Sequence, residues 1–159
     1  MAALENWTIS GLDVRNAYLY GKLDEEIYME QPEGFRMEGY EDYVIRLKRA
    51  LYGLKQAGLA WWRTLRDSMK DLGFEILKSD AGLFIFRNKH GYVIAVIYVD
   101  DALFCGPNKE LVQELKQKFM KRWESWDLGD ITKFFRMKIT RVGSKIYLDQ
   151  CTYLEAILQ

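Results

Sequence analysis

The spacing of apolar residues divides the chain into short predicted strands joined by turns. Alternating apolar and polar positions are typical of half-buried strands, and short apolar runs between turn residues are typical of buried ones. Residues 26–31 and 43–47 alternate and are predicted to pair, and hairpins are predicted around residues 88–91 and 143–144. The predicted strands are residues 7–13, 26–31, 43–47, 82–86, 92–98, 102–105, 134–140 and 145–148.

Two longer segments carry apolar residues at helical spacing. Asn108 is a suitable N-cap for a helix over residues 108–122, and Gly73 is a natural end for a helix over residues 56–72. Shorter helical segments are predicted at residues 17–20 and 152–158. Together the elements predict an α+β domain, an antiparallel sheet with helices packed against one face. The apolar stripe of the first long helix is Gly58, Trp62, Leu65, Met69 and Leu72.

Composition narrows this picture to a globular protein. The chain has 159 residues, of which 49% are hydrophobic and 14% aromatic, so one domain with a sizeable core is expected and disorder is not. No long uncharged apolar stretch and no signal-peptide pattern is present, so we expect a soluble protein without a membrane partner.

The cysteines and the histidine exclude several kinds of chemistry. Cys105 and Cys151 form no spaced metal or redox motif and are expected to be reduced, as in an intracellular protein. His90 lies in a predicted turn and is expected to be solvated. Zinc chemistry and a Ser-His-Asp triad therefore have little support.

Net charge is zero, but the charge is unevenly distributed. Residues 1–45 carry ten acidic side chains against three basic ones, and residues 46–70 carry seven basic side chains against one acidic one. Complementary solvated surfaces are the favoured interpretation of this asymmetry. The alternative is a basic strip that follows a phosphate backbone.

The sequence Tyr98-Val99-Asp100-Asp101 is the most informative stretch. It places two adjacent carboxylates between apolar runs, in the pattern strand, tight turn, strand. Taken alone, an ordinary solvated hairpin is the favoured interpretation. Acids framed by buried strands repel each other, however, unless a cation lies between them, and Mg²⁺ prefers oxygen ligands. Asp13 also follows an apolar strand, so three carboxylates would form a two-metal site if the strands are neighbours.

Several long motifs, in order, resemble the reverse transcriptases of copia-type LTR retrotransposons. Residues 12–21 (LDVRNAYLYG) match the first catalytic motif of that family, and the run from Leu23 to Phe35 (LDEEIYMEQPEGF) is nearly diagnostic of it. Residues 51–57 (LYGLKQA), followed by Trp61 and Trp62, resemble the second conserved block, and residues 98–101 resemble the third. Residues 126–130 (WDLGD) resemble a later block, and residues 134–139 stand where a primer-supporting hairpin is expected.

The resemblance implies a role for each matching residue. Asp13 and Asp101 would be the main metal ligands and Asp100 the second acid of the turn. Tyr18 would exclude a ribose 2′-hydroxyl, whereas without the motif a core aromatic is the favoured interpretation. Gln56 would contact the incoming nucleotide, and Tyr98 would lie near the primer end. Backbone amides for the triphosphate would come from Val14, Arg15, Asn16 and Ala17.

The resemblance also implies the fold, the cofactors and the partners. Residues 1–159 would form a single palm-like domain with partial fingers, truncated on the N-terminal fingers side. The expected cofactors are two Mg²⁺ or Mn²⁺ ions, and the expected partners are an RNA or DNA template–primer, deoxynucleoside triphosphates and other parts of the retrotransposon polyprotein. The expected location is the cytoplasm, in a virus-like particle, and the family allows a nuclear phase.

The chain departs from the family pattern at two places, neither of which includes the three acids. Gly58 and Leu59 stand where the family carries proline and arginine. Phe135 and Arg136 stand near the position where the family usually has a Leu-Gly pair.

The main hypothesis is an RNA-directed DNA polymerase that transfers nucleotides to a primer 3′-hydroxyl. The alternative is an inactive, retrotransposon-derived protein that binds nucleic acid or has a structural role. Another palm-type phosphotransferase, such as a nucleotide cyclase, is disfavoured by the long motifs.

Overall fold

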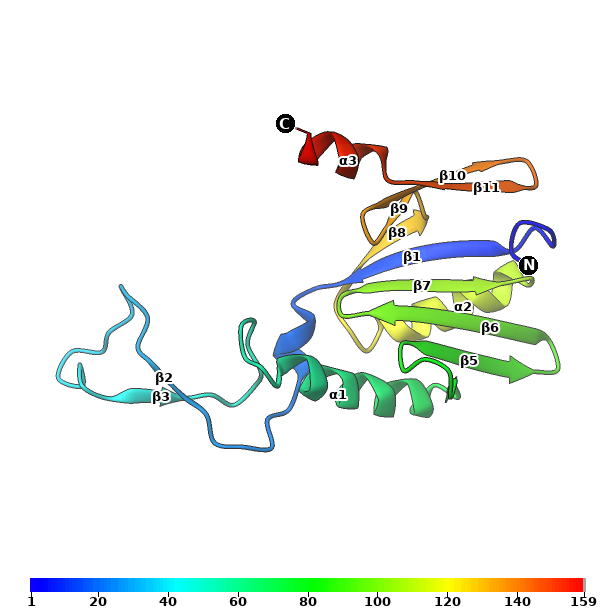
Figure 1. The fold of residues 1–159 in the computed structure, drawn as a ribbon. Coiled ribbons are helices and arrows are strands. Elements are labelled where there is room, and N and C mark those ends of the chain that lie inside the picture. The colour runs from blue at the N-terminus through cyan, green and yellow to red at the C-terminus, as the bar shows by residue number, and fades with distance from the viewer. Residues whose placement is uncertain (159) are drawn as a thin grey trace. The chain divides into compact units, whose positions relative to one another are not determined.

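The computed structural model describes residues 1–158 and contains two compact units (Figure 1). The first unit is formed by Met1–Arg15 together with the chain from Ser68 onward, and the second by Asn16–Asp67. The expectation of a single domain over residues 1–159 stays a prediction. Within residues 1–158, no helix is long and apolar enough to cross a membrane.

A six-stranded sheet forms the centre of the first unit, and every neighbouring pair in it is antiparallel. The hairpin predicted around residues 88–91 is present, and the tight turn at residues 99–100 leads into the next strand. The first strand in the sequence lies between two strands that come about a hundred residues later (Figure 1). The order across the sheet is β4 (Glu75–Ile76), β5 (Leu83–Asn88), β6 (Gly91–Tyr98), β7 (Asp101–Gly106), β1 (Thr8–Val14) and β8 (Ser125–Asp130).

Helix α2 (Lys109–Met120) packs against β1, β6 and β7. The predicted cap is confirmed, because the side chain of Asn108 accepts a hydrogen bond from the backbone N–H of Leu111 at 2.9 Å. Phe119 is fully buried and its ring lies 5.6 Å from that of Phe104 on β7, centroid to centroid. Aromatic contacts of this kind form the core beneath the sheet.

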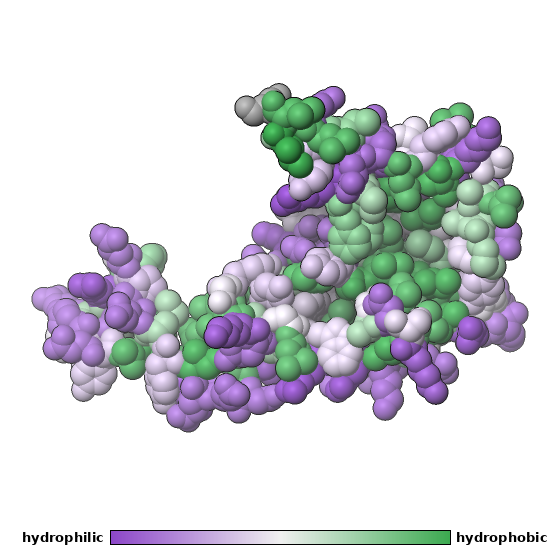
Figure 2. All heavy atoms as spheres, viewed as in Figure 1, coloured by the Kyte–Doolittle hydropathy of each residue, from purple (hydrophilic) through white to green (hydrophobic). Residues whose placement is uncertain are grey.

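A second, three-stranded antiparallel sheet completes the first unit with β9 (Lys133–Phe134), β10 (Met137–Val142) and β11 (Lys145–Asp149). The hairpin predicted around residues 143–144 is confirmed. The strand predicted over residues 134–140 is interrupted, because Phe135 and Arg136 both have positive φ values, of 50° and 61°. The last helix is α3 (Cys151–Ile157). Its exposed apolar side chains form a hydrophobic patch in Figure 2.

The second unit contains the short 3-10 helix η1 (Ala17–Tyr20), the paired strands β2 (Tyr28–Glu30) and β3 (Val44–Arg46), and most of helix α1 (Ala57–Asp71). All four elements were predicted from the sequence. The β2–β3 pair is more exposed than its alternation suggests, and its surroundings are mainly hydrophilic in Figure 2.

Leu65 and Met69 of the predicted stripe of α1 are buried, but the buried face is rotated so that it includes Trp61 in place of Trp62. Trp61 is 2% exposed, whereas Trp62 is only partly buried and lies under the guanidinium of Arg66. The ring of Trp61 packs against Tyr20, and Gly21 leaves room for the helix backbone, because a Cβ at Gly21 would meet the Trp61 nitrogen at 2.8 Å. The observed elements confirm the α+β class with a large antiparallel sheet.

Candidate functional site

Asp13 lies near the end of β1, between two neighbouring strands. Its Cα pairs with that of Asp101 on β7, and on the other side it pairs with Trp126 on β8. Antiparallel partners have Cβ atoms about 4.5–5.5 Å apart. The pairing therefore brings together two acids that lie far apart in the sequence.

The turn between β6 and β7 holds the other acid. Tyr98 and Asp101 pair across the hairpin, so Val99 and Asp100 form its two-residue loop. Val99 has φ = 57°, a left-handed conformation that costs a β-branched residue about 1–3 kcal/mol. The carbonyl of Asp100 accepts a 2.7 Å hydrogen bond from the N–H of Val14, which ties the loop to the end of β1.

The three carboxylates affect one another electrostatically. Burial raises the pKa of Asp101 above its usual value, the charges of Asp100 and Asp13 raise it further, and the charge of Lys133 opposes the increase. Burial and the charge of Asp100 likewise raise the pKa of Asp13. Such mutual repulsion at neutral pH favours a cation between the acids.

The carboxylates fit the preference of Mg²⁺ for oxygen ligands, although they do not form a complete cage. Within residues 1–158, no group of three or more His, Cys, Asp or Glu side chains is arranged so that it could hold a metal ion. Mg²⁺ is usually bound by one or two carboxylates, with waters and substrate phosphates completing its coordination. Asp13 and Asp101 on adjacent strands suit that mode of binding.

Val14 and Arg15 were predicted to offer backbone amides, and both amides have partners here. The N–H of Val14 donates to Asp100, and the N–H of Arg15 donates to the carbonyl of Glu124 at 2.9 Å. The guanidinium of Arg15 forms an ion pair with the Glu124 carboxylate and lies 5.7 Å from the centroid of the Trp126 ring. A substrate that uses these two amides would have to replace the present hydrogen bonds.

The other predicted nucleotide contacts belong to the second unit. Asn16 has φ = 50°, and Ala17 is fully buried. Tyr18 packs against a small alanine core, and its ring centroid lies 4.6 Å from that of Tyr52. Its partial burial suits both a core aromatic and a residue with one accessible face.

Gln56 lies just before α1, where its carbonyl accepts a hydrogen bond from Ala60 at 2.9 Å. It lines a pocket of about 210 Å³ together with Lys22 and Arg63. Gly58 and Leu59, the first departure from the family pattern, are exposed at the start of the helix. Their replacement of proline and arginine therefore does not disturb the core.

Tyr98 is 62% exposed and contacts a turn that the sequence did not predict. Its ring meets that of Phe135 edge-on, with centroids 4.8 Å apart. Phe135 and Arg136 form the two-residue turn between β9 and β10, a position where positive φ normally favours asparagine or glycine. Phe135 and Arg136, the second departure from the family pattern, therefore lie in a strained turn. This turn contacts Tyr98, the residue just before the Val99–Asp100 loop.

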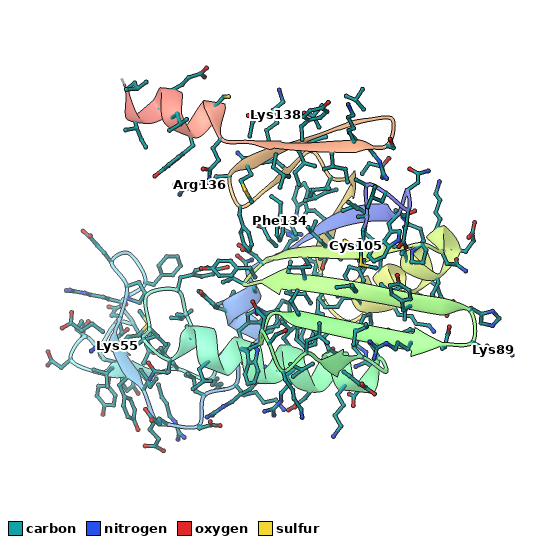
Figure 3. All side chains as sticks on the ribbon, turned by 45° about the vertical axis from the view of Figure 1, so that its right-hand side comes forward. Lys55, Lys89, Cys105, Phe134, Arg136 and Lys138 are labelled. Atoms are coloured by element: carbon teal, nitrogen blue, oxygen red, sulfur yellow. The ribbon has the colours of Figure 1, made fainter. Side chains whose placement is uncertain are left out.

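A basic pocket lies beside this turn, with a volume of about 490 Å³. Lys133 on β9, Arg136 in the turn and Lys138 on β10 line it, and Tyr153 and Ala156 line it from α3. Figure 3 shows Arg136 and Lys138 along the turn and the strand that follows. Their positive charges suit an anionic partner.

A buried polar network beneath β1 was missed by the sequence analysis. Lys116 on α2 is fully buried, its Nζ donates to Ser10 Oγ at 2.7 Å, and it forms an ion pair with Asp127 on β8. The one sequence signal was the position of Lys116 beside the apolar face of the predicted helix.

The cysteines and the histidine behave as the composition suggested. Both cysteines are free, and burial raises the pKa of the Cys105 thiol to about 11, so it is protonated at neutral pH. His90 is exposed in the turn between β5 and β6.

Comparison with known proteins finds one family over the whole chain. The model of the family described as reverse transcriptase (RNA-dependent DNA polymerase) matches residues 1–159. The chain is 38% identical over 162 residues to the retrovirus-related Pol polyprotein from transposon TNT 1-94 of Nicotiana tabacum, covering 100% of the chain and 12% of that protein. It is 36% identical to the Pol polyprotein from transposon RE2 of Arabidopsis thaliana, covering 96% of the chain and 10% of that protein. It is also 36% identical to the putative transposon Ty5-1 protein of Saccharomyces cerevisiae, covering 80% of the chain and 42% of that protein.

Proposed function

The chain belongs to the reverse transcriptases of copia-type retrotransposons, and we propose that it catalyses RNA-directed DNA synthesis by a two-metal mechanism. It spans about a tenth of the length of its plant relatives, so the activity is proposed for this segment of a polyprotein. The observation that carries the proposal is the pairing of Asp13 with Asp101, next to a strained loop that holds Asp100.

In the proposed reaction, the 3′-hydroxyl of a primer attacks the α-phosphorus of a deoxynucleoside triphosphate, and pyrophosphate leaves. Divalent ions supply the chemistry by lowering the pKa of the hydroxyl and by neutralising the charge of the leaving phosphates. Asp13 and Asp101 would hold these ions, with Asp100 as the second acid of the turn. Strand pairing fixes the backbones of the two main ligands before substrate binds, which limits reorganisation during the reaction.

The first unit is proposed to be the palm and the second to include part of the fingers. An antiparallel sheet with acids at one strand end and in one tight turn supports the first assignment. The second unit contains the candidate nucleotide contacts Tyr18 and Gln56. The proposed setting is a polyprotein in a cytoplasmic virus-like particle, with other parts of that polyprotein as partners.

The direct test offers the purified chain a primed RNA template with deoxynucleotides and Mg²⁺ or Mn²⁺. We expect extension of the primer by one or more nucleotides. Binding of the template–primer without any extension would instead support the inactive, nucleic-acid-binding alternative. A primed DNA template in a parallel reaction separates RNA-directed from DNA-directed synthesis.

Replacing Tyr18 with alanine is expected to weaken discrimination against ribonucleotides. A ring beneath the sugar leaves no room for a 2′-hydroxyl, and steric selection of this kind is worth about 1–3 kcal/mol, or roughly 10- to 200-fold. The measurement is kcat/KM for a ribonucleotide and its deoxynucleotide in primer extension. Tyr52→Ala is the comparison variant, because it removes the neighbouring ring while the chain keeps the Tyr18 side chain. An unchanged preference in Tyr18→Ala would remove this role.

The basic pocket beside β10 is proposed to contact the phosphates of the template–primer. We expect the double variant Arg136→Gln/Lys138→Gln to bind a primed template more weakly than the wild type, whatever the base sequence of the template. Each lost phosphate contact should reduce the dependence of log K on log salt by about one unit. The measurement is fluorescence anisotropy between low and moderate salt. Lys145→Gln, an exposed change at the β10–β11 turn, is the control and should bind as the wild type does.

A further inference from the structure

A β-bulge interrupts the pairing of β1 with β8 just before Asp13. Gly11 pairs with Gly129 and Leu12 pairs with Asp127, so Leu128 is an extra residue on β8. Gly129 has φ = 61°, a conformation that glycine adopts at little cost. The bulge sets the register that places Trp126 opposite Asp13. Because side chains alternate along a strand, slipping the register by one residue would reverse which face they occupy.

Polar side chains hold both sides of this bulge. Asp127 accepts a 2.7 Å hydrogen bond from the N–H of Gly129, and Ser10 Oγ donates to the carbonyl of Gly129 at 3.2 Å. Lys116 contacts both of these side chains, through its hydrogen bond to Ser10 and its ion pair with Asp127. One buried ammonium therefore joins β1 to β8 at the bulge.

A buried charge is an expensive way to join two strands. Replacing a buried ion pair with well-packed apolar residues is often neutral or stabilising, so stability alone does not account for a lysine here. A contact that specifies the strand register does account for the lysine. An apolar side chain could pack well in several registers of β1 and β8, whereas the ammonium requires Ser10 and Asp127 together.

We propose that Lys116 is a positioning residue for Asp13. It locks the β1–β8 bulge and thereby holds the Asp13 carboxylate in the arrangement with Asp101 that binds divalent ions. The inference rests on the proposed function for its catalytic consequence, but the effect on ion binding can be measured without catalysis. The Trp126–Asp130 segment, which resembles a family motif, therefore also has a structural role, because Asp127 and Gly129 flank the extra residue of the bulge, Leu128.

The test compares Lys116→Met with Lys118→Met, the same substitution on the same helix. Lys118 is exposed and pairs with Glu114, so its loss leaves the bulge intact. We expect Lys116→Met to fold and to bind Mn²⁺ about 10-fold more weakly, the lower end of the range for supporting residues around metal sites. Lys118→Met should bind Mn²⁺ as the wild type does. Titration calorimetry measures the affinity, and hydrogen exchange of residues 8–14 should accelerate in Lys116→Met alone.

The outcomes separate this proposal from the proposed function. Wild-type Mn²⁺ affinity in a folded Lys116→Met variant overturns the positioning role, and so does the absence of Mn²⁺ binding by the wild type. If the wild type binds Mn²⁺ but does not extend primers, the proposed polymerase function is overturned. The positioning role of Lys116 is then still decided by comparing the Mn²⁺ affinities of the variants and the wild type. If Lys116→Met does not fold, Asp127→Asn decides, because it keeps an acceptor for the Gly129 N–H and removes the charge that pairs with Lys116. Unchanged Mn²⁺ affinity in that variant overturns the proposal.

Discussion

Replacing Asp101 with asparagine is expected to abolish primer extension while leaving the chain folded and slightly more stable at neutral pH. Loss of a carboxylate that is proposed to bind the ions would remove several kcal/mol of transition-state stabilisation. Each 1.36 kcal/mol corresponds to a factor of ten in rate, so the loss should be about 1,000-fold or more. Single-turnover extension with saturating template–primer measures it. Glu75→Gln, an exposed acid on the edge strand β4, should extend primers at the wild-type rate.

The same substitution should change the dependence of stability on pH in a defined direction. The pKa of Asp101 is raised in the folded chain, so its contribution to stability is fully present below the ordinary value of 3.8. That contribution is lost as pH rises through the raised pKa, because the ionised carboxylate is partly buried near Asp100 and Asp13. Asparagine does not ionise, so Asp101→Asn should gain stability relative to the wild type as pH rises.

Thermal unfolding of both chains between pH 3.5 and pH 7.5 checks the direction. Because Asp101 is partly exposed, we expect a rise in Tm of only about 1–2 °C for the variant at the upper end. A variant that extends primers normally would remove Asp101 from the site. A variant whose relative stability falls with increasing pH would contradict the proposed repulsion among the three acids.

Replacing Asp127 with alanine is expected to cause a large loss of stability. Removing one partner of a buried ion pair typically costs 3–5 kcal/mol, and the 41% exposure of the Asp127 side chain reduces this to about 2–3 kcal/mol. Lys116 would remain fully buried without its carboxylate, and the N–H of Gly129 would lose its acceptor. Urea unfolding measures the change, and Tm should fall by about 5–10 °C.

Two comparisons isolate the ion pair as the cause. Asp130→Ala, an exposed change on the same strand, should alter stability by no more than about 0.5 kcal/mol. Adding Lys116→Met to Asp127→Ala should recover much of the loss, because no unpaired charge remains buried. If the double variant is as unstable as the sum of the single variants, the ion pair is not the source of the effect.

Acid should weaken the contribution of Asp127. Burial acts to raise its pKa, but the hydrogen bonds from Lys116 and the Gly129 N–H hold the pKa below its ordinary value of 3.8. The stabilisation is therefore present above pH 3.8 and is lost as pH falls through the lowered pKa. The wild type and Asp127→Ala should become more similar in stability as pH decreases below that value.

Elements with strong local signals were predictable from the sequence. The hairpin around residues 88–91 and the Asn108 cap depend on turn and capping chemistry within a few residues, and both are present. β8 was missed because Ser125–Asp130 contains two aspartates and a glycine, residues typical of turns, and its apolar residues Trp126 and Leu128 are exposed. The rotation of α1 toward Trp61 was missed because two adjacent tryptophans leave the buried face ambiguous until the packing partner, Tyr20, is known.

The sequence by itself determined the family and the α+β class and indicated the three candidate acids, because long ordered motifs and local hydrogen-bonding preferences are written along the chain. Only the tertiary structure decided that Asp13 faces Asp101, because β1 enters the sheet between two strands that come about a hundred residues later. Only it showed that Lys116 is buried at a bulge beside Asp13. Both results depend on contacts between residues that lie far apart in the sequence. The free energy of burying a charged side chain depends on those distant neighbours, and no local sequence pattern specifies them.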